Sequence, residues 1–187
     1  MINHKVVWAP WRMSYILGKK DPGCFLCEAQ AKGPGEETLV LTMTEHSLVI
    51  LNRYPYANGH LMVTPRRHVS RLHQLTRAER TDLHELLVQA LQIVERELHT
   101  EGLNTGMNLG KAAGAGLEEH LHYHVVPRWF GDTNAMTAVG GVRVMPEDLG
   151  AVYRRLAPAF AALADESPVR TPTAREGVDE HMRSPKR

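Results

Sequence analysis

Apolar side chains recur at helical spacing in one long segment of the chain, residues 76–101. They are Leu83, Leu86, Leu87, Ala90, Leu91, Val94 and Leu98. This spacing brings them to one face of a helix. Thr76 is placed as the N-cap with Glu79 three residues later, and Gly102 follows the last turn. The pattern predicts one long amphipathic helix, with His84 and His99 outside its apolar face as solvated residues.

Short apolar or β-branched runs predict four strands, at residues 47–52, 60–65, 104–109 and 121–126. The first two strands flank a turn-rich connection, which predicts an antiparallel pair. Residues 151–163 predict a terminal helix that is interrupted near Pro158. The predicted fold class is therefore α+β, an antiparallel sheet of about five strands with one long helix packed on it.

Length and composition suit one globular domain, because the 187 residues are 43% apolar and 23% charged. We expect this domain at residues 1–160, followed by a polar, disordered tail at residues 161–187. The net charge of +1 provides no basic surface for long nucleic acids. The apolar part of the N-terminal segment is too short and too polar for a signal peptide, and no apolar stretch is long enough to span a membrane. These features predict a soluble cytoplasmic protein that binds neither nucleic acid nor membrane.

Three histidines alternate with other residues at His120, His122 and His124. Successive side chains of a strand point to opposite faces, so the three imidazoles share one face. Three close imidazolium groups would repel one another, and at least one ring should be neutral at pH 7. A neutral ring is a nucleophile or a metal ligand. The alternative is a surface strand with incidental histidines, but histidine has no strand preference that would explain the alternation.

A loop of glycine and alanine, residues 110–116, directly precedes these histidines. Loops of small residues let backbone N–H groups approach phosphate oxygens closely, although many such loops are simply tight turns. Placed beside a nucleophilic histidine, this loop indicates phosphoryl or nucleotidyl transfer through a covalent histidine intermediate.

The two cysteines of the chain form a single CxxC motif, Cys24 and Cys27. The motif is compatible with a redox site, half of a zinc site or an incidental pair. A redox site is expected at the start of a helix in a βαβ unit, and no such unit precedes Cys24. Zinc is the better interpretation, and a closed tetrahedral site then needs two further ligands.

The segment 120–126, His-Leu-His-Tyr-His-Val-Val, resembles the signature of the histidine-triad (HIT) superfamily, and Pro127-Arg128 follow it as they do in that superfamily. The resemblance extends over residues 52–65, which are similar to the ribose-binding strand pair of the superfamily, and covers roughly residues 8–145. Two further segments, the opening at residues 8–12 and the later residues 129–134, resemble the bacterial branch that includes diadenosine tetraphosphate phosphorylases.

The resemblance implies a HIT-like fold and a role for each matching residue. His122 would be the nucleophile that forms a nucleotidyl-histidine, and His124 would bond phosphate oxygens near the scissile bond. The implied nucleotide-binding residues are Asn52 at the ribose, Asn108 at the phosphate chain, the backbone of Gly114, Ala115 and Gly116 at the α-phosphate, Lys111 and Trp129. Lys111 and Arg128 are candidates for binding incoming phosphate. Many relatives carry Gln or Ser where this chain has Gly116, and Glu118 and Glu119 place negative charge beside the anion site.

The resemblance also implies the metal ligands. In branches with this CxxC, a histidine after the second strand and the first triad histidine complete the site, here His68 and His120 with Cys24 and Cys27. His120 would then be structural. His46, His60 and His73 are alternative ligands, although we expect His60 to make a structural hydrogen bond at the start of its strand.

The predicted function is phosphorolysis of diadenosine polyphosphates, with inorganic phosphate as second substrate and attack at the α-phosphorus. Hydrolysis of dinucleoside polyphosphates or adenosine phosphoramidates is one alternative, and nucleotidyl transfer from a sugar phosphate is another. A non-catalytic nucleotide-binding protein is a third. We also expect a homodimer that extends the sheet and buries an edge strand.

Overall fold

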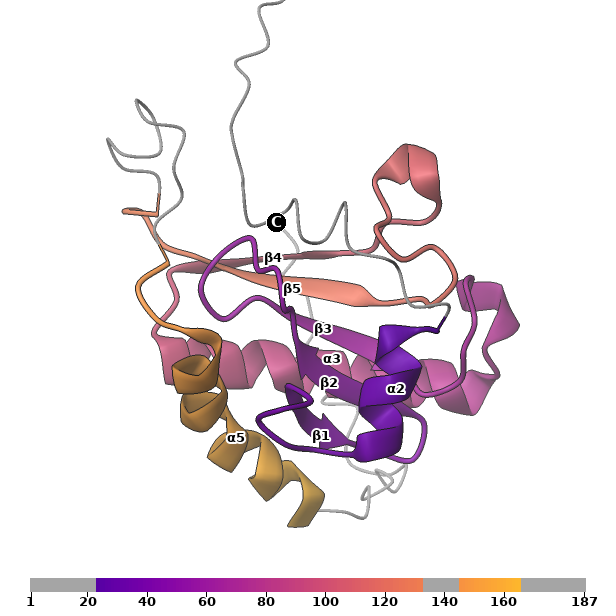
Figure 1. Cartoon of the computed structure of the whole chain (residues 1–187), viewed down its shortest axis with the longest axis horizontal. Helices are drawn as coiled ribbons and strands as arrows, with labels where there is room; N and C mark the ends of the chain where they lie inside the picture. The colour runs from indigo at the N-terminus through magenta and orange to yellow at the C-terminus, as the bar shows by residue number, and fades with distance from the viewer. Residues whose placement is uncertain (1–22, 133–144, 166–187) are drawn as a thin grey trace, which may run out of the picture.

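A five-stranded antiparallel sheet forms the centre of the computed structural model, which describes residues 23–132 and 145–165 (Figure 1). The strands are β1 (Val40–Met43), β2 (Ser47–Leu51), β3 (Leu61–Pro65), β4 (Gly102–Gly106) and β5 (Tyr123–Arg128). Their order is β1-β2-β3-β5-β4, and every neighbouring pair is antiparallel. Together with the helices, this sheet confirms the predicted α+β class.

Helices cover the sheet so that its central strands are buried. Every residue of β2 and β3 is buried. Helix α3 (Arg77–Leu98) runs behind the sheet in Figure 1, and the short helix α2 (Phe25–Lys32) lies in front of it. Helix α5 (Leu149–Asp165) packs against β1 and α3. The core therefore lies on the α3 side, where apolar residues of the predicted helix face the strands.

The long helix forms as predicted, with one difference at its end. Thr76 Oγ1 accepts a hydrogen bond from the Glu79 backbone N–H at 3.2 Å, and the Glu79 carboxylate accepts from the Thr76 N–H at 2.6 Å. This capping box satisfies two N–H groups that the first turn would leave without partners. The helix ends at Leu98 because His99 takes a left-handed φ of 49°. Gly102, expected to end the helix, instead begins β4.

The predicted interruption at Pro158 is wrong, because α5 continues through it to Asp165. Proline removes one backbone hydrogen bond from a helix interior. The apolar face formed by Val152, Leu156 and Phe160 is fully buried on both sides of Pro158, and its burial keeps the helix continuous. The helix therefore crosses position 160, where the sequence placed the end of the domain.

The strand that carries the histidines begins later than predicted. Its ladder starts at Tyr123, and Met62 of β3 pairs with His124. Leu121 lies before the ladder, where its backbone N–H donates to Val69 O at 2.7 Å and its carbonyl accepts from the buried Thr64 hydroxyl at 2.7 Å. Residues 120–122 are thus held by side-chain and loop contacts instead of strand pairing. Strand β1 and helix α2 are elements that the apolar pattern did not predict.

Some predictions concern residues outside the described ranges. These are the opening at residues 8–12, the end of the segment 129–134 and the tail from position 166. Within residues 23–132 and 145–165, no helix has the length and apolar character needed to cross a membrane.

Candidate active site and metal centre

His122 is buried, and its orientation is set by its own backbone neighbourhood. Its Nδ1 lies 2.8 Å from the carbonyl oxygen of His120. A carbonyl can only accept a hydrogen bond, so Nδ1 carries the proton and the lone pair lies on Nε2. Burial lowers the pKa of His122 below its usual value. A neutral imidazole with a free Nε2 lone pair is the form that attacks phosphorus.

A second histidine outside the triad determines the proton position on His124. The Tyr56 backbone N–H donates to His60 Nδ1 at 3.0 Å, so His60 must carry its proton on Nε2. That Nε2 lies 3.0 Å from His124 Nδ1, which therefore accepts. His124 is left with its N–H on Nε2. Because His60 is fully buried, this chain of hydrogen bonds is shielded from water and can hold His124 as a donor toward a phosphate oxygen.

The Tyr56 ring packs against this histidine pair. Its ring centroid lies 4.7 Å from that of His60 and 5.8 Å from that of His124. Burial, followed by the charge of His122, lowers the pKa of His124 to about 4. His124 is therefore neutral at pH 7, as the hydrogen-bond chain requires.

The sequence predicted a structural hydrogen bond for His60, and the structure shows such a bond to the Tyr56 backbone. Its contact with His124 was not anticipated. The only signal was spacing along the strand. His60 lies two residues before Met62, which pairs with His124, so His60 and His124 share a face of the sheet. This follows only once the register of β3 against β5 is known.

Replacing His60 should impair catalysis more than substrate binding. His60→Ala removes the donor that orients His124, and we expect kcat to fall by roughly 10–100-fold with little change in KM. His60→Gln should recover most of the loss, because its amide can accept from the Tyr56 N–H and donate to His124. Steady-state kinetics test this, with the exposed His84→Ala as control. Equal kcat for His60→Ala and the wild type would contradict this role.

Four side chains from three distant parts of the chain meet at the start of α2. Each contributes one potential ligand atom, and these atoms all lie within 4.8 Å of one another; the residues are Cys24, Cys27, His68 and His120. Cys24 caps α2, and the three-residue spacing puts both sulfurs on one side of the helix. His120 Nδ1 lies 3.3 Å from Cys24 Sγ, and His68 Nδ1 lies 3.3 Å from Cys27 Sγ.

The chemistry of this set fits a tetrahedral metal ion with sulfur and nitrogen ligands. His120 Nε2 lies 2.8 Å from the Pro65 carbonyl, so it carries the proton and leaves the Nδ1 lone pair aimed at the sulfurs. Burial and the neighbouring Cys24 sulfur raise the pKa of Cys27 to about 11. Without a cation Cys27 is therefore a neutral thiol at pH 7, and two thiolates this close together would need a metal ion to balance their charge. Of the alternative ligands His46, His60 and His73, none belongs to this cluster.

The two predicted asparagines have half-buried side chains. Asn52 follows β2, where its backbone N–H donates to His60 O at 2.9 Å and its Oδ1 accepts from the Tyr54 N–H. The Asn52 amide NH2 group remains available as a donor. Asn108 follows β4, at the entrance to the loop of residues 110–116.

The glycine and alanine loop forms a short helical turn at residues 111–113. The Gly114 N–H donates to Lys111 O at 2.8 Å, and the Ala115 N–H donates to Gly110 O at 3.3 Å. Two of the three backbone groups expected at the α-phosphate are therefore engaged within the loop. Binding a phosphate through them requires the turn to open, for which the left-handed Gly114, with φ of 84°, leaves freedom.

Three other predicted residues lie at the edge of this region or away from it. Lys111 is exposed, and its Nζ lies 3.4 Å from the Glu118 carboxylate. Trp129 donates from Nε1 to His99 O, at the far end of β5, about 20 Å from His122 by strand geometry. Arg128 pairs with Asp132 at 2.5 Å beside β4. The structure thus does not bring Trp129 or Arg128 to the histidines of the same chain.

Comparison with known proteins agrees with this geometry. The HIT domain family matches residues 35–131. The chain is 40% identical over 163 residues to the AP-4-A phosphorylase of Mycobacterium tuberculosis, an alignment that covers 83% of this chain and 84% of that protein. It is 36% identical over 85 residues to the bis(5'-adenosyl)-triphosphatase of Dictyostelium discoideum, covering 46% of this chain and 56% of that protein.

Among solved structures, a Zn-bound histidine triad family protein from Mycobacterium smegmatis superposes with a TM-score of 0.60. It is 27% identical and covers 78% of this chain and 98% of its own. The fold and the triad define a histidine-triad protein, and the resemblance predicted from the sequence is confirmed. The chain belongs to the HIT domain family.

Proposed function

We propose that the protein is a nucleotidyl transferase that cleaves diadenosine polyphosphates by phosphorolysis. The observation that carries the proposal is the protonation pattern of the triad: His122 presents a free Nε2 lone pair, and His124 presents an Nε2–H donor. A nucleophile and a hydrogen-bond donor side by side, with ring centroids 4.9 Å apart, suit displacement at phosphorus.

The reaction would proceed in two displacements. His122 Nε2 attacks the α-phosphorus, the bond from phosphorus to the bridging oxygen breaks, and the nucleoside polyphosphate leaves. His124 donates a hydrogen bond to phosphate oxygens near the breaking bond as charge develops there. An oxygen of inorganic phosphate then attacks the nucleotidyl-histidine, the P–N bond breaks, and His122 regains its lone pair. Diadenosine tetraphosphate and phosphate would give ADP and ATP.

Around this centre we propose that Asn52 binds the ribose and Asn108 the phosphate chain. The backbone of Gly114, Ala115 and Gly116 would bind the α-phosphate after the turn opens, and the exposed Lys111 would attract incoming phosphate. Two contacts support this arrangement: the Asn52 N–H donates to His60 O, and Asn108 lies two residues after Gly106, which pairs with His124.

We further propose zinc at Cys24, Cys27, His68 and His120. This site is structural: its closed set of four protein ligands leaves no position for substrate. It holds the start of α2 against the segment before β5. The His120 carbonyl, which orients His122, belongs to one of these ligands, and this connects the metal centre to the reactive histidine.

We propose a homodimer in the cytoplasm. Strand β4 lies at the edge of the sheet and its last three residues are exposed, so a second copy could pair with it. A site built on two reduced cysteines suits a compartment in which thiols stay reduced.

Phosphate dependence distinguishes phosphorolysis from hydrolysis, the activity suggested by the triphosphatase relative. Diadenosine tetraphosphate should be converted to ADP and ATP only when inorganic phosphate is present, and label from radioactive phosphate should appear in ADP. Chromatography of the products with and without phosphate measures this, with His122→Ala as the inactive control. Release of AMP and ATP at the same rate without phosphate would show hydrolysis instead.

A further inference from the structure

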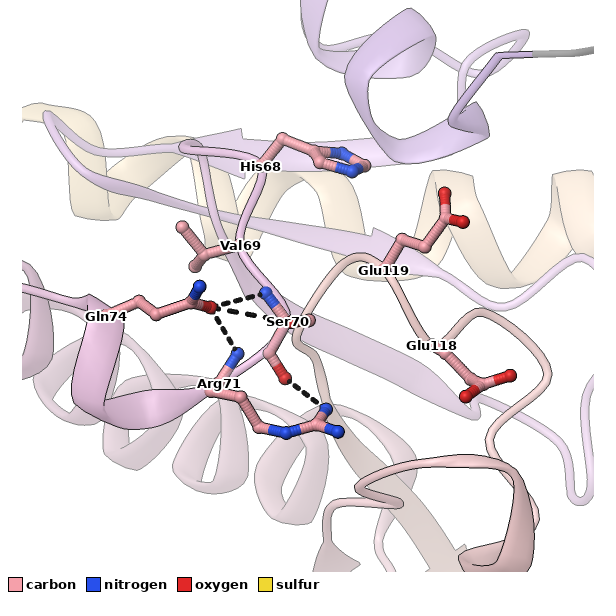
Figure 2. Close-up of a pocket in the computed structure, with 7 residues that line it drawn as sticks. All are labelled: His68, Val69, Ser70, Arg71, Gln74, Glu118 and Glu119. Atoms are coloured by element: carbon pink, nitrogen blue, oxygen red, sulfur yellow. Dashed lines mark hydrogen bonds between the residues drawn. The ribbon is translucent and has the colours of Figure 1, made fainter.

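An open groove of about 410 Å³ lies between residues 68–74 and the residues just before the triad (Figure 2). His68, Arg71 and Gln74 line one side, and the carboxylates of Glu118 and Glu119 line the other. The volume falls in the range of small-molecule sites. Unlike most such sites, this groove is lined by charged groups of both signs.

The groove borders the loop that is proposed to bind phosphate. The Arg71 guanidinium lies 3.9 Å from the position that a Cβ on Gly110 would occupy. On the opposite side, the Glu118 carboxylate pairs with Lys111 of the same loop. A ligand in the groove would therefore lie next to a phosphate chain that is held by the loop.

The groove also lies in the direction that the phosphate chain must take. The triad runs from His120 through His122 to His124. Asn52, the proposed ribose contact, is hydrogen-bonded to His60, which contacts His124 at one end of the triad. At the other end, the His120 ring lies 5.0 Å from the His68 ring at the rim of the groove. His120 and His122 are two residues apart, so their Cα atoms lie at most about 7 Å apart and the rim of the groove is close to the triad. A polyphosphate chain that starts at the nucleoside bound by Asn52 and passes His122 therefore continues toward the groove.

We propose that this groove binds the second nucleoside of the dinucleoside polyphosphate, an inference that rests on the proposed function. Arg71 binds the last phosphate of the leaving group: its Nη1 donates to Ser70 O, and its other guanidinium N–H groups have no partner among the described residues. Glu119 accepts hydrogen bonds from the ribose hydroxyls. Its exposed carboxylate has no hydrogen bond or ion pair within the described part of the chain.

This assignment explains why acidic residues stand beside an anion site. The nucleoside at the far end of the substrate is uncharged, whereas a nucleotide with a bare terminal phosphate would bring extra negative charge to Glu118 and Glu119. Like charges at close range are repelled. The groove therefore selects polyphosphates capped by a second nucleoside over mononucleotides with the same number of phosphates.

The test compares diadenosine tetraphosphate with adenosine 5'-tetraphosphate, which lacks the second nucleoside. Glu119→Gln should lower kcat/KM about 10-fold for the capped substrate, as expected from losing hydrogen bonds to a charged group, and raise it for the uncapped one. Arg71→Ala should raise KM for both substrates and leave KM for inorganic phosphate unchanged. Glu85→Gln, an exposed glutamate on α3, is the matched control. Zinc content is measured in each variant, because Glu119 precedes His120.

Two results would overturn the inference. One is an unchanged ratio of kcat/KM between the two substrates in Glu119→Gln. The other is an Arg71→Ala variant that raises KM for inorganic phosphate alone, which would make the groove the site of the incoming phosphate. Diadenosine tetraphosphate labelled at the α-phosphates tests the proposed function separately, because it should leave label on His122 of the wild type after a single turnover. Absence of that label would refute the proposed function itself, whereas labelled wild type with an unchanged substrate ratio in Glu119→Gln would refute only the groove assignment.

Discussion

His122→Ala should lower turnover of diadenosine tetraphosphate by roughly 10⁴-fold or more, because the variant lacks the proposed nucleophile, His122 Nε2. Binding of AMP should remain close to that of the wild type, since the proposed ribose and phosphate contacts come from other residues. Titration calorimetry measures the binding and steady-state assays measure the rate. His84→Ala, an exposed histidine of α3, should retain full activity.

The covalent intermediate can be observed directly. A single-turnover mixture of the wild-type enzyme with substrate labelled at the α-phosphates, quenched in alkali to preserve the P–N bond, should leave label on the protein. Mass spectrometry should locate AMP on His122, and His60→Ala should form this adduct more slowly. A His122→Ala enzyme with near-wild-type turnover, together with no adduct after rapid quenching, would disprove the mechanism.

Removal of the two cysteines should have the largest effect on stability. We expect about one zinc per chain in protein purified without a metal-affinity tag, and none after Cys24 and Cys27 are both changed to Ser. Structural zinc contributes to folding free energy, since the ligands assemble only in the folded chain. A loss of about 3 kcal/mol would lower Tm by roughly 6–12 °C for a domain of this size.

Two controls separate the metal from other effects of the cysteine change. A strong chelator should lower the Tm of the wild type toward that of the double variant and leave the double variant unchanged. His73→Ala, which changes an exposed histidine outside the cluster, should keep both zinc and Tm. Zinc at full occupancy in the double variant would rule out this ligand set. Loss of zinc should also lower activity, because His120, one of the proposed ligands, orients His122 through its carbonyl.

Much of the site could be predicted from the sequence because its signals are local. The alternation of His120, His122 and His124 predicted that these histidines lie together, although only His124 lies within the strand. The CxxC motif predicted half of a metal site, although the helix that carries Cys27 was not predicted. The long helix was predictable from its apolar period and from the capping box of Thr76 and Glu79. In each case the signal comes from residues within a few positions of one another.

Only the tertiary structure decided the features that depend on how distant segments pair. The register of β3 against β5 brings His60 to His124, and this contact, 64 residues apart in the chain, determines which nitrogen of His124 carries the proton. Burial of Val152, Leu156 and Phe160 keeps α5 continuous through Pro158, because tertiary packing outweighs a local helix breaker. The groove likewise exists only where residues 68–74 meet Glu118 and Glu119. Local spacing carries no information about such contacts, since they are determined by the free energy of burying the assembled core.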